Sequence, residues 1–336
     1  MATPLVVRHA ACAPQAHCVL TMGIGTLFAL AAGLRWGLVF VTPLLLPDTP
    51  AALLSAGRYL AFGLIALPIA WLDRARLAQL TRADWAEAAK LSLVGNLLYY
   101  LCLAAAIQRA GAPLPTMIIG TLPVVIAICS NARNARRDGR LPWARLAPSL
   151  ALIAAGIACV NQAELGQLDA ASAPARYASG ALLAVAAVAC WTWYPIRNAD
   201  WLRAHARRSP RSWATAQGLV TLPLAALAYA LWLLFAGAQS PLGPTPERFI
   251  ALMFALGLLA SWLGTLCWNE ASQRLPTTLA GQLIVFETLA ALAYAFVLRG
   301  RWPSGLTLAG IALLIAGVAW ALRIEPEPLA AEGHAG

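Results

Sequence analysis

Apolar stretches of membrane-spanning length recur along the whole chain, and this feature limits the possible folds more than any other. A helix needs roughly 20 apolar residues to cross a bilayer. The breaks between the stretches are short and rich in turn-forming residues, as in LLPDTP, GAPLP and SPLGPTP. The sequence therefore predicts an all-α integral membrane protein with ten transmembrane helices. The predicted spans are 21–41, 51–72, 89–107, 113–131, 144–161, 178–196, 213–236, 249–270, 276–298 and 304–322.

The amino-acid composition is that of a protein surrounded by lipid. Hydrophobic residues occupy 60% of the 336 positions, charged residues 11%, and the mean hydropathy is +0.69. A water-soluble domain of this composition would expose large apolar patches. The formal net charge of +10 could suggest nucleic acid, but the basic residues lie in loops next to the spans. We therefore expect membrane lipid and a small-molecule substrate as partners, and no nucleic acid.

The basic residues are unevenly divided between the two sides. The loops after spans two, four and six hold most of them, and the connections of opposite parity hold few. By the positive-inside bias, the rich side is cytoplasmic. An even number of spans then places both termini in the cytoplasm, in a bacterial inner membrane. The basic residues on the rich side are Arg74, Arg76, Arg82, Lys90, Arg133, Arg136, Arg137, Arg140, Arg145, Arg197, Arg203, Arg207, Arg208 and Arg211.

The histidines and cysteines predict no cofactor and no metal site. All four histidines fall in tails or a loop, and the seven cysteines form no C-x-x-C pattern. Tryptophans near the span ends, among them Trp71, Trp201, Trp213 and Trp302, are expected to be anchors at the membrane interface.

The two halves of the chain resemble each other. Gly25 to Trp36 reads GTLFALAAGLRW, and Gly180 to Trp191 reads GALLAVAAVACW. Five spans per repeat is an odd number, so the second copy is inverted, as in secondary transporters. This divides the chain into a cytoplasmic tail 1–20, a first repeat 21–161, a periplasmic linker 162–177, a second repeat 178–323 and a cytoplasmic tail 324–336.

These patterns resemble a known family of transporters. The RWG of span one, Arg58-Tyr59, Gly111 and Pro113 before span four, and the final LAGIALLIAGV look like the EamA group of the drug/metabolite transporter (DMT) superfamily. Three further patterns are similar to aromatic amino acid exporters. They are Tyr99-x-x-Cys102-Leu-Ala, Trp191-x-x-Tyr194 with Asn198, and Trp268-Asn269.

The resemblance implies ten helices around a central cavity, with alternating access and export of amino acids or similar metabolites. The chain also departs from the family. Members commonly carry a proline in the middle of span nine and an acidic residue after its glycine, whereas this chain has Glu287-Thr288 and Gly300-Arg301.

Span six ends in the aromatic run CWTWYPIRNADW. On a helix, Ala187, Trp191, Tyr194 and Asn198 share one face, and Trp36 is the repeat-related counterpart of Trp191. Flat aromatic faces suit an apolar or aromatic substrate side chain. Trp36, Trp191 and Tyr194 are therefore candidates for substrate binding, and packing between helices is the alternative.

Spans three and eight supply further candidates: Asn96, Tyr99, Tyr100, Trp268 and Asn269. Polar groups at membrane depth must face protein or water. For the serines and threonines beside them, such as Ser261 and Thr265, hydrogen bonding between helices is the favoured interpretation.

Glu287 is the most informative single residue, because it lies in the middle of span nine. A charge there is costly, so the carboxyl group must be protonated, paired or in contact with a wet cavity. It is the candidate for ion coupling and for binding a substrate ammonium, and Gln282 of the same span is a further substrate-binding candidate. The structural alternative is a pair with Arg35 or Arg58. Arg58 itself is expected to reach the interface or cap helix ends.

The leading hypothesis is a secondary exporter of aromatic or other hydrophobic amino acids, or of similar small metabolites. The alternatives are export of other drugs or metabolites in the same fold, and a non-transporting scaffold or receptor. An intramembrane enzyme is not expected, because no H-E-x-x-H, paired carboxylates or serine with a histidine base is present. The sequence leaves the oligomeric state open, with a monomer as one form that it allows.

Overall fold

The computed structural model describes residues 15–110, 115, 118–133, 141–165, 174–235, 240–300, 302–324 and 327, and this part of the chain is built from helices joined by short turns. The α-helices are α1 Gln15–Leu45, α2 Ala51–Leu72, α3 Arg74–Leu77, α4 Arg82–Leu91, α5 Tyr99–Ala110, α7 Leu122–Arg133, α9 Trp143–Leu165, α10 Pro174–Ala204, α11 Pro210–Phe235, α12 Pro246–Leu256, α13 Gly264–Arg274, α14 Thr277–Leu283, α15 Val285–Arg299 and α16 Gly305–Ala321.

Among the described residues, seven helical runs are long and apolar enough to cross a membrane. Three shorter apolar helices accompany them: Leu122–Arg133, Trp143–Cys159 and Gly305–Ala321. Each of the ten overlaps one predicted span, although the start of the predicted span 113–131 lies outside the described residues. Helices α9 and α10 also extend into the predicted linker 162–177, as far as Leu165 and from Pro174.

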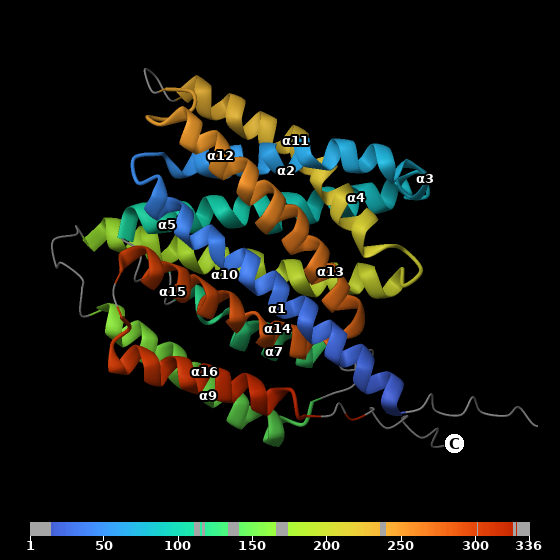
Figure 1. Cartoon of the computed structure of the whole chain (residues 1–336), viewed down its shortest axis with the longest axis vertical. Coiled ribbons are helices and arrows are strands. Elements are labelled where there is room, and N and C mark those ends of the chain that lie inside the picture. The colour runs from blue at the N-terminus through green and yellow to red at the C-terminus, as the bar shows by residue number, and fades with distance from the viewer. Residues whose placement is uncertain are drawn as a thin grey trace, which may run out of the picture.

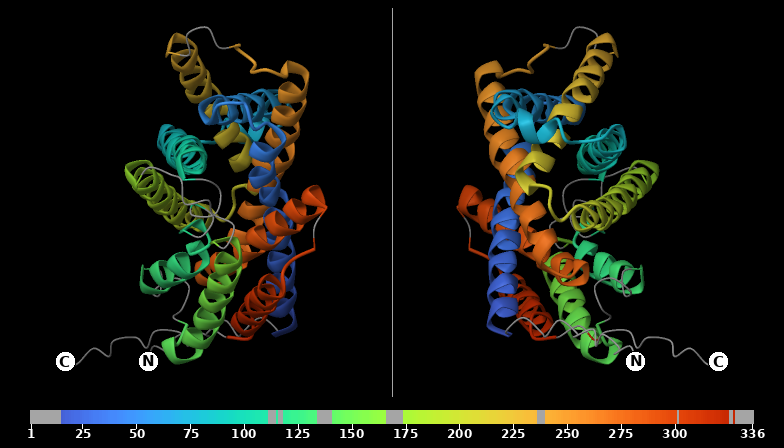
Figure 2. Two further views of the ribbon diagram at one scale, coloured as in Figure 1. Left: turned by 90° about the vertical axis from the view of Figure 1, so that its left-hand side faces the viewer. Right: turned by 90° about the vertical axis from the view of Figure 1, so that its right-hand side faces the viewer.

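Helices of the first half of the chain pack mainly against helices of the second half. Helix α2 lies along α11, α9 along α16, α7 along α14 and α5 along α10, while α1 contacts both α13 and α15. The α2–α11 pair lies at one edge of the bundle and the α9–α16 pair at the other, and the second pair stays together in all views (Figure 1 and Figure 2). The central helices α1, α5, α10 and α13 lie between these pairs.

Small residues permit the close approach of α9 and α16. A Cβ added at Gly156 would lie 2.8 Å from Leu314, and one added at Gly317 would lie 2.8 Å from Ile153. Small residues at such crossings let helix backbones approach within van der Waals distance in lipid. The segments 152–160, LIAAGIACV, and 313–321, LLIAGVAWA, are similar, and Gly156 and Gly317 hold the same position in them. The two segments therefore pack against each other through matching positions.

Two π-helical segments interrupt long helices at related places. Ser92–Leu98 joins α4 to α5, and Gly257–Leu263 joins α12 to α13, each with seven residues. Each segment ends the same number of residues before a Gln-Arg pair, Gln108-Arg109 or Gln273-Arg274. A π-helical turn widens the helix locally and redirects the side chains that follow it. Periodicity assuming an α-helix did not predict either segment.

The predicted span 276–298 is two helices. The chain turns at Ile284 between α14 and α15, where the N–H of Ile284 donates to Gly281 O at 3.3 Å and the N–H of Glu287 to Ile284 O at 2.9 Å. Glu287 therefore lies in the first turn of α15 and not in the middle of an unbroken helix. The positive end of the helix dipole favours an acidic residue at that position.

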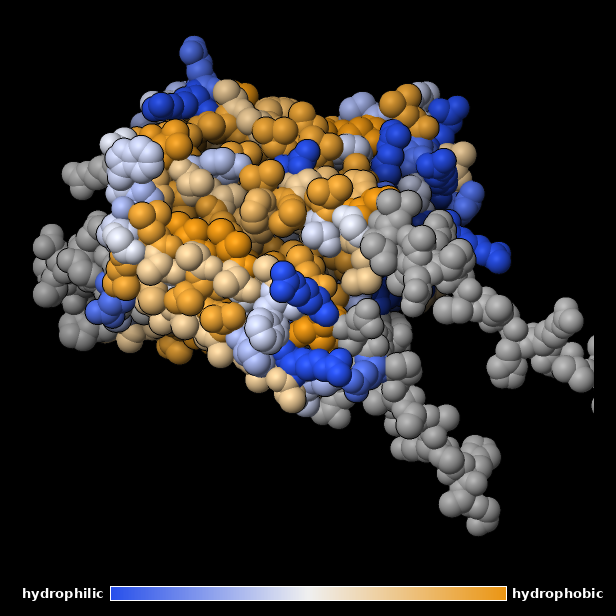
Figure 3. Space-filling model, turned by 60° about the horizontal axis from the view of Figure 1, so that its bottom comes forward, coloured by the Kyte–Doolittle hydropathy of each residue, from blue (hydrophilic) through white to orange (hydrophobic). Residues whose placement is uncertain are grey.

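The outer surface is apolar in its middle. Figure 3 shows hydrophobic residues across the broad centre of one face, with the strongly hydrophilic residues gathered mostly toward its ends and edges. Exposed apolar side chains include Leu182, Phe235 and Val297. Trp71 and Trp302 are exposed, as expected for interface anchors, but Trp201 and Trp213 are buried, which corrects their predicted role. Both pack inside the protein at the ends of α10 and α11.

Candidate functional site

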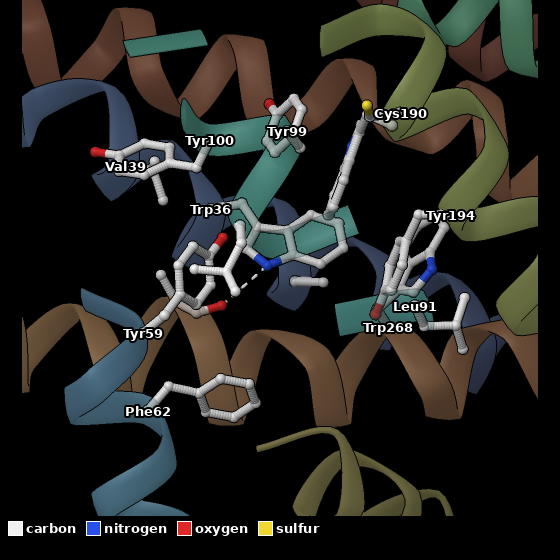
Figure 4. Close-up of a cluster of buried hydrophobic side chains, with 14 of the residues drawn as sticks. Trp36, Val39, Tyr59, Phe62, Leu91, Tyr99, Tyr100, Cys190, Tyr194 and Trp268 are labelled. Atoms are coloured by element: carbon white, nitrogen blue, oxygen red, sulfur yellow. Dashed lines mark hydrogen bonds between the residues drawn. The ribbon is translucent and has the colours of Figure 1, made fainter. Parts of the chain in front are cut away.

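A cluster of aromatic side chains fills the centre of the bundle. The Trp36 ring centroid lies 5.1 Å from that of Trp191 and 5.3 Å from that of Trp268. Trp191 stacks on Tyr99 at 4.7 Å and on Tyr194 at 4.9 Å. Figure 4 shows the Trp36 indole in the middle of this cluster. The five rings come from α1, α5, α10 and α13, so the cluster joins both halves of the chain.

Helix geometry around the second π-helical segment holds Trp36 in place. Its indole Nε1 donates to Ala260 O at 3.0 Å, a bond drawn in Figure 4. A Cβ added at Gly264 would lie 2.7 Å from the same nitrogen, so glycine is required for this contact. Within the π-helical segment, carbonyl groups are less regularly paired than in an α-helix. The Ala260 carbonyl can therefore accept a hydrogen bond from a neighbouring helix.

A small cavity lies against this cluster. Its volume is about 20 Å³, close to the space that one water molecule needs. A larger ligand would therefore require the surrounding side chains or helices to move. The cavity is lined by Trp36, Val39, Arg58, Tyr59, Asn96, Tyr99, Trp191, Ala260, Ser261, Thr265 and Glu287.

Glu287 lies in the cavity wall and is 7% exposed. Its Oε2 has no hydrogen-bond partner in the described part of the protein, and no described basic group forms an ion pair with it within 4.0 Å. The predicted structural alternative, a direct pair with Arg35 or Arg58, is therefore absent from the described contacts. Arg35 instead donates to Ala31 O of its own helix at 2.7 Å.

Helix α1 brings two glycines against the start of α15. A Cβ at Gly33 would lie 3.0 Å from the backbone nitrogen of Glu287, and one at Gly37 would lie 2.8 Å from Ala290. This Gly-x-x-x-Gly spacing is typical of closely packed membrane helices. The approach brings Trp36, on the same helix, to the same cavity as Glu287.

Arg58 is a cavity residue, which corrects the expectation that it reaches the interface. It is 5% exposed, and its Nε donates to Ser261 Oγ at 3.0 Å. Its guanidinium carbon lies 4.9 Å from the Tyr59 ring centroid and 5.0 Å from that of Tyr100. Such contacts with π-faces stabilise a buried cation without neutralising it. The cation therefore remains available to an anionic group in the cavity.

A buried hydrogen-bond network lies behind the aromatic cluster. Asn198 Oδ1 accepts from Trp213 Nε1 at 2.9 Å and from Gln217 Nε2 at 3.2 Å, and Asn198 Nδ2 donates to Asn269 Oδ1 at 2.8 Å. Tyr194 donates its hydroxyl proton to Gln217 Oε1 at 3.0 Å. We call these five residues the Asn198 network. It connects α10, α11 and α13, and through Tyr194 it contacts the aromatic cluster.

The predicted site residues thus fall into three groups. Trp36, Asn96, Tyr99, Trp191 and Glu287 line the cavity together. The second group packs directly behind this wall and comprises Tyr100, Tyr194 and Trp268. The third group forms other buried contacts: Asn269 belongs to the Asn198 network, and Gln282 accepts from Ser149 Oγ at 3.1 Å. Substrate binding by the residues of all three groups stays a prediction.

Sequence reasoning did not select Arg58, Tyr59, Ser261 and Thr265, although all four line the cavity. Arg58 carries a signal that could have identified it, because an ionisable residue inside an apolar span marks a functional site by default. Ser261 and Thr265 carry no such signal. Among the described residues, no group of three or more His, Cys, Asp and Glu side chains is arranged to hold a metal ion.

Comparisons with known proteins agree with this architecture. The model of the EamA-like transporter family matches residues 23–160 and 178–323. The inner membrane protein YtfF of Escherichia coli K12 is 56% identical over 308 residues, which cover 90% of this chain and 96% of the relative. A crystal structure shares the fold with a TM-score of 0.69 at 21% identity, covering 88% of this chain and 96% of that chain. The chain is therefore a multi-pass integral membrane protein that belongs to the EamA-like transporter family.

Proposed function

We propose that the protein is a secondary exporter of aromatic or other hydrophobic amino acids, or of similar small metabolites. It works by alternating access in a bacterial inner membrane, with both termini cytoplasmic. One observation carries the proposal. An aromatic wall, a carboxyl group without an ion-pair partner among the described residues and a buried guanidinium group line the same cavity.

These three features match the three parts of an aromatic amino acid. The faces of Trp36, Tyr99 and Trp191 suit an apolar or aromatic side chain. Arg58 suits a carboxylate, because its guanidinium group can donate two parallel hydrogen bonds. Glu287 suits an ammonium group or carries a proton between the two faces of the membrane. A substrate of one charge sign would leave one of the two groups unpaired.

The small cavity supports a mechanism with a closed intermediate. A volume of about 20 Å³ is too small for an indole or phenyl ring. Binding therefore requires the side chains or helices around the cavity to move apart on one side. Alternating access is this separation, made first on one side and then on the other.

Internal symmetry supports ten spans arranged as two inverted repeats. Trp36 and Trp191, which hold matching positions in the similar segments, contact each other in the aromatic cluster. The two π-helical segments hold matching positions in α4–α5 and α12–α13, and each supplies cavity residues, Asn96 from the first and Ser261 from the second. A site between inverted repeats is the expected place for a transported substrate.

The test is efflux of labelled tryptophan, phenylalanine and methionine, with threonine as a control, from proteoliposomes with and without an imposed pH gradient. We expect selective efflux of the aromatic amino acids, and loss of its pH response in Glu287→Gln. Glu270→Gln is the matched control, because Glu270 pairs with Arg274 on α13 and does not line the cavity.

Absence of efflux of every amino acid above protein-free liposomes would contradict amino acid export. A screen of other metabolites would then separate a different exporter from a scaffold or receptor. An unchanged pH response in Glu287→Gln, with efflux intact, would remove Glu287 from ion coupling.

A further inference from the structure

A second and larger pocket lies at the end of the bundle where α3 meets the turn between α10 and α11. This end carries Arg74, Arg76, Arg207 and Arg208, and we call it the arginine-rich end. The pocket has a volume of about 420 Å³, within the range of small-molecule sites. Its walls include Arg76 and Gln79 on one side and Arg207, Arg208, Ser209 and Ser212 on the other.

The charges around this pocket leave a positive surplus. Three guanidinium groups line it, and two carboxylates lie next to it. Arg76 Nε is 3.8 Å from Asp73 Oδ1, and Arg208 Nη2 is 3.8 Å from Asp84 Oδ2. His205 Nε2 also lies 3.7 Å from Asp84 Oδ1. Both ion pairs are long, and Arg207 is exposed at the pocket wall. An anion entering the pocket would therefore meet uncompensated positive charge.

The pocket floor is rigid. Trp201 and Trp213 line it and stack with their rings 7° from parallel. Trp201 Nε1 donates to Asp84 Oδ1 at 2.9 Å, and Trp213 Nε1 donates to Asn198 Oδ1 at 2.9 Å. The carboxylate of Asp84 also accepts from the backbone and hydroxyl of Thr81, and Asp84 itself is not one of the lining residues.

The start of α11 adds a second source of positive potential. Ser209 and Ser212 line the pocket at the first turn of this 26-residue helix, which begins at Pro210. The first N–H groups of a helix have no partner within the helix, and the helix dipole is positive there. Ser212 Oγ already donates to Asp73 Oδ2, so this carboxylate offsets part of the potential of the helix end. The arginines are therefore the main attraction for a phosphate group.

We propose that this pocket binds a phosphate-bearing anion, supplied either by the headgroup of an anionic phospholipid or by a free phosphate compound in solution. The site is separate from the central cavity, because Trp213 in the pocket floor is connected to the aromatic cluster only through Asn198, Gln217 and Tyr194 of the Asn198 network in the described contacts. Binding here does not depend on the proposed function of the central cavity.

The experiment measures binding to the full chain in a neutral detergent by isothermal titration calorimetry. The probes are inorganic phosphate, short-chain phosphatidylglycerol and short-chain phosphatidylcholine. The test variant is Arg76→Gln with Arg207→Gln, because both side chains are exposed and their removal leaves the Arg208–Asp84 pair intact. Arg82→Gln is the matched control, since Arg82 is an exposed arginine nearby in sequence that does not line the pocket.

We expect the wild type to bind phosphatidylglycerol at least about ten-fold more tightly than phosphatidylcholine, with a loss of about ten-fold or more in the double variant. The control should stay within about two-fold of the wild type. Phosphatidylglycerol binding without phosphate binding would assign the lipid headgroup, and binding of both would assign any phosphate group. Equal binding of the two lipids together with no phosphate binding, or an unchanged double variant, would overturn the proposal. Thermal denaturation of all variants separates lost binding from lost folding.

Discussion

The central cavity and the arginine-rich end both contain buried carboxyl groups, but their surroundings differ. At the arginine-rich end, Asp84 accepts from Thr81 and Trp201 and lies near two basic side chains, and Glu87 pairs with Arg197 at 2.6 Å. In the cavity, the Oε2 of Glu287 has no partner among the described residues. A buried polar group without a partner destabilises the folded state. Structural stability therefore does not explain Glu287, whereas it explains Asp84.

The largest expected difference between the two regions is in folding stability. Asp84→Asn removes the charge that holds Trp201 and caps α4, so we expect it to lower the free energy of unfolding by about 2–4 kcal/mol. Glu287→Gln removes no ion pair of the described part of the chain and should change the free energy of unfolding by less than about 1 kcal/mol. Denaturant titration of the purified protein measures both. Equal losses in the two variants would mean that Glu287 also holds the fold.

The cavity wall can be disturbed without changing any charge. Gly264→Val would place a side chain against Trp36 Nε1, where even a Cβ would lie 2.7 Å away. We expect a loss of about 1–3 kcal/mol in stability and loss of transport, because Trp36 must move. Gly23→Val is the control, since a Cβ there meets nothing within 4 Å. If transport by Gly264→Val equals that of the control, the position of Trp36 is not important for substrate passage.

The role of Arg58 can be separated from that of Glu287 with paired substrates. Arg58→Gln should raise the KM for tryptophan about ten-fold, because the substrate carboxylate loses its guanidinium partner. It should leave tryptamine, which has no carboxylate, nearly unchanged. Arg35→Gln is the control, because Arg35 does not line the cavity. Equal losses for tryptophan and tryptamine would indicate that Arg58 has only a packing role.

The smallest expected effect belongs to the ion pair between Glu87 and Arg197. The Arg197 side chain is 44% exposed, so solvent screens the pair. A double-mutant cycle with Glu87→Gln and Arg197→Gln should give a coupling energy of no more than about 1 kcal/mol. A larger coupling would show that charge pairs at this end contribute more than their exposure suggests.

The sequence alone was sufficient to determine that this protein is surrounded by lipid, and it supplied some of the residues of the cavity wall as candidates. Apolar stretches of membrane length decide the class of fold, because the hydrocarbon core accepts only segments that satisfy their own backbone hydrogen bonds. Helical periodicity selected Trp191, the internal repeat selected Trp36, and an acidic residue inside an apolar span selected Glu287, and these three residues line one cavity. An acidic residue in such a span is informative because a charge facing lipid is costly.

Only the tertiary structure decided which residues of other helices contact each of these helix faces. Arg58 is a cavity residue because Tyr59 of its own helix, Tyr100 of α5 and Ser261 of the second π-helical segment surround it. Tyr100 and Ser261 are far from Arg58 in the sequence, so periodicity within α2 could not predict these contacts. The burial of Trp213 likewise depends on a neighbouring helix, because Asn198 of α10 accepts from its indole nitrogen. Periodicity within one helix indicates which side chains share a face. The partner of that face is set by the packing of the whole bundle, because the energy of a buried polar group depends on the groups that other helices bring to it.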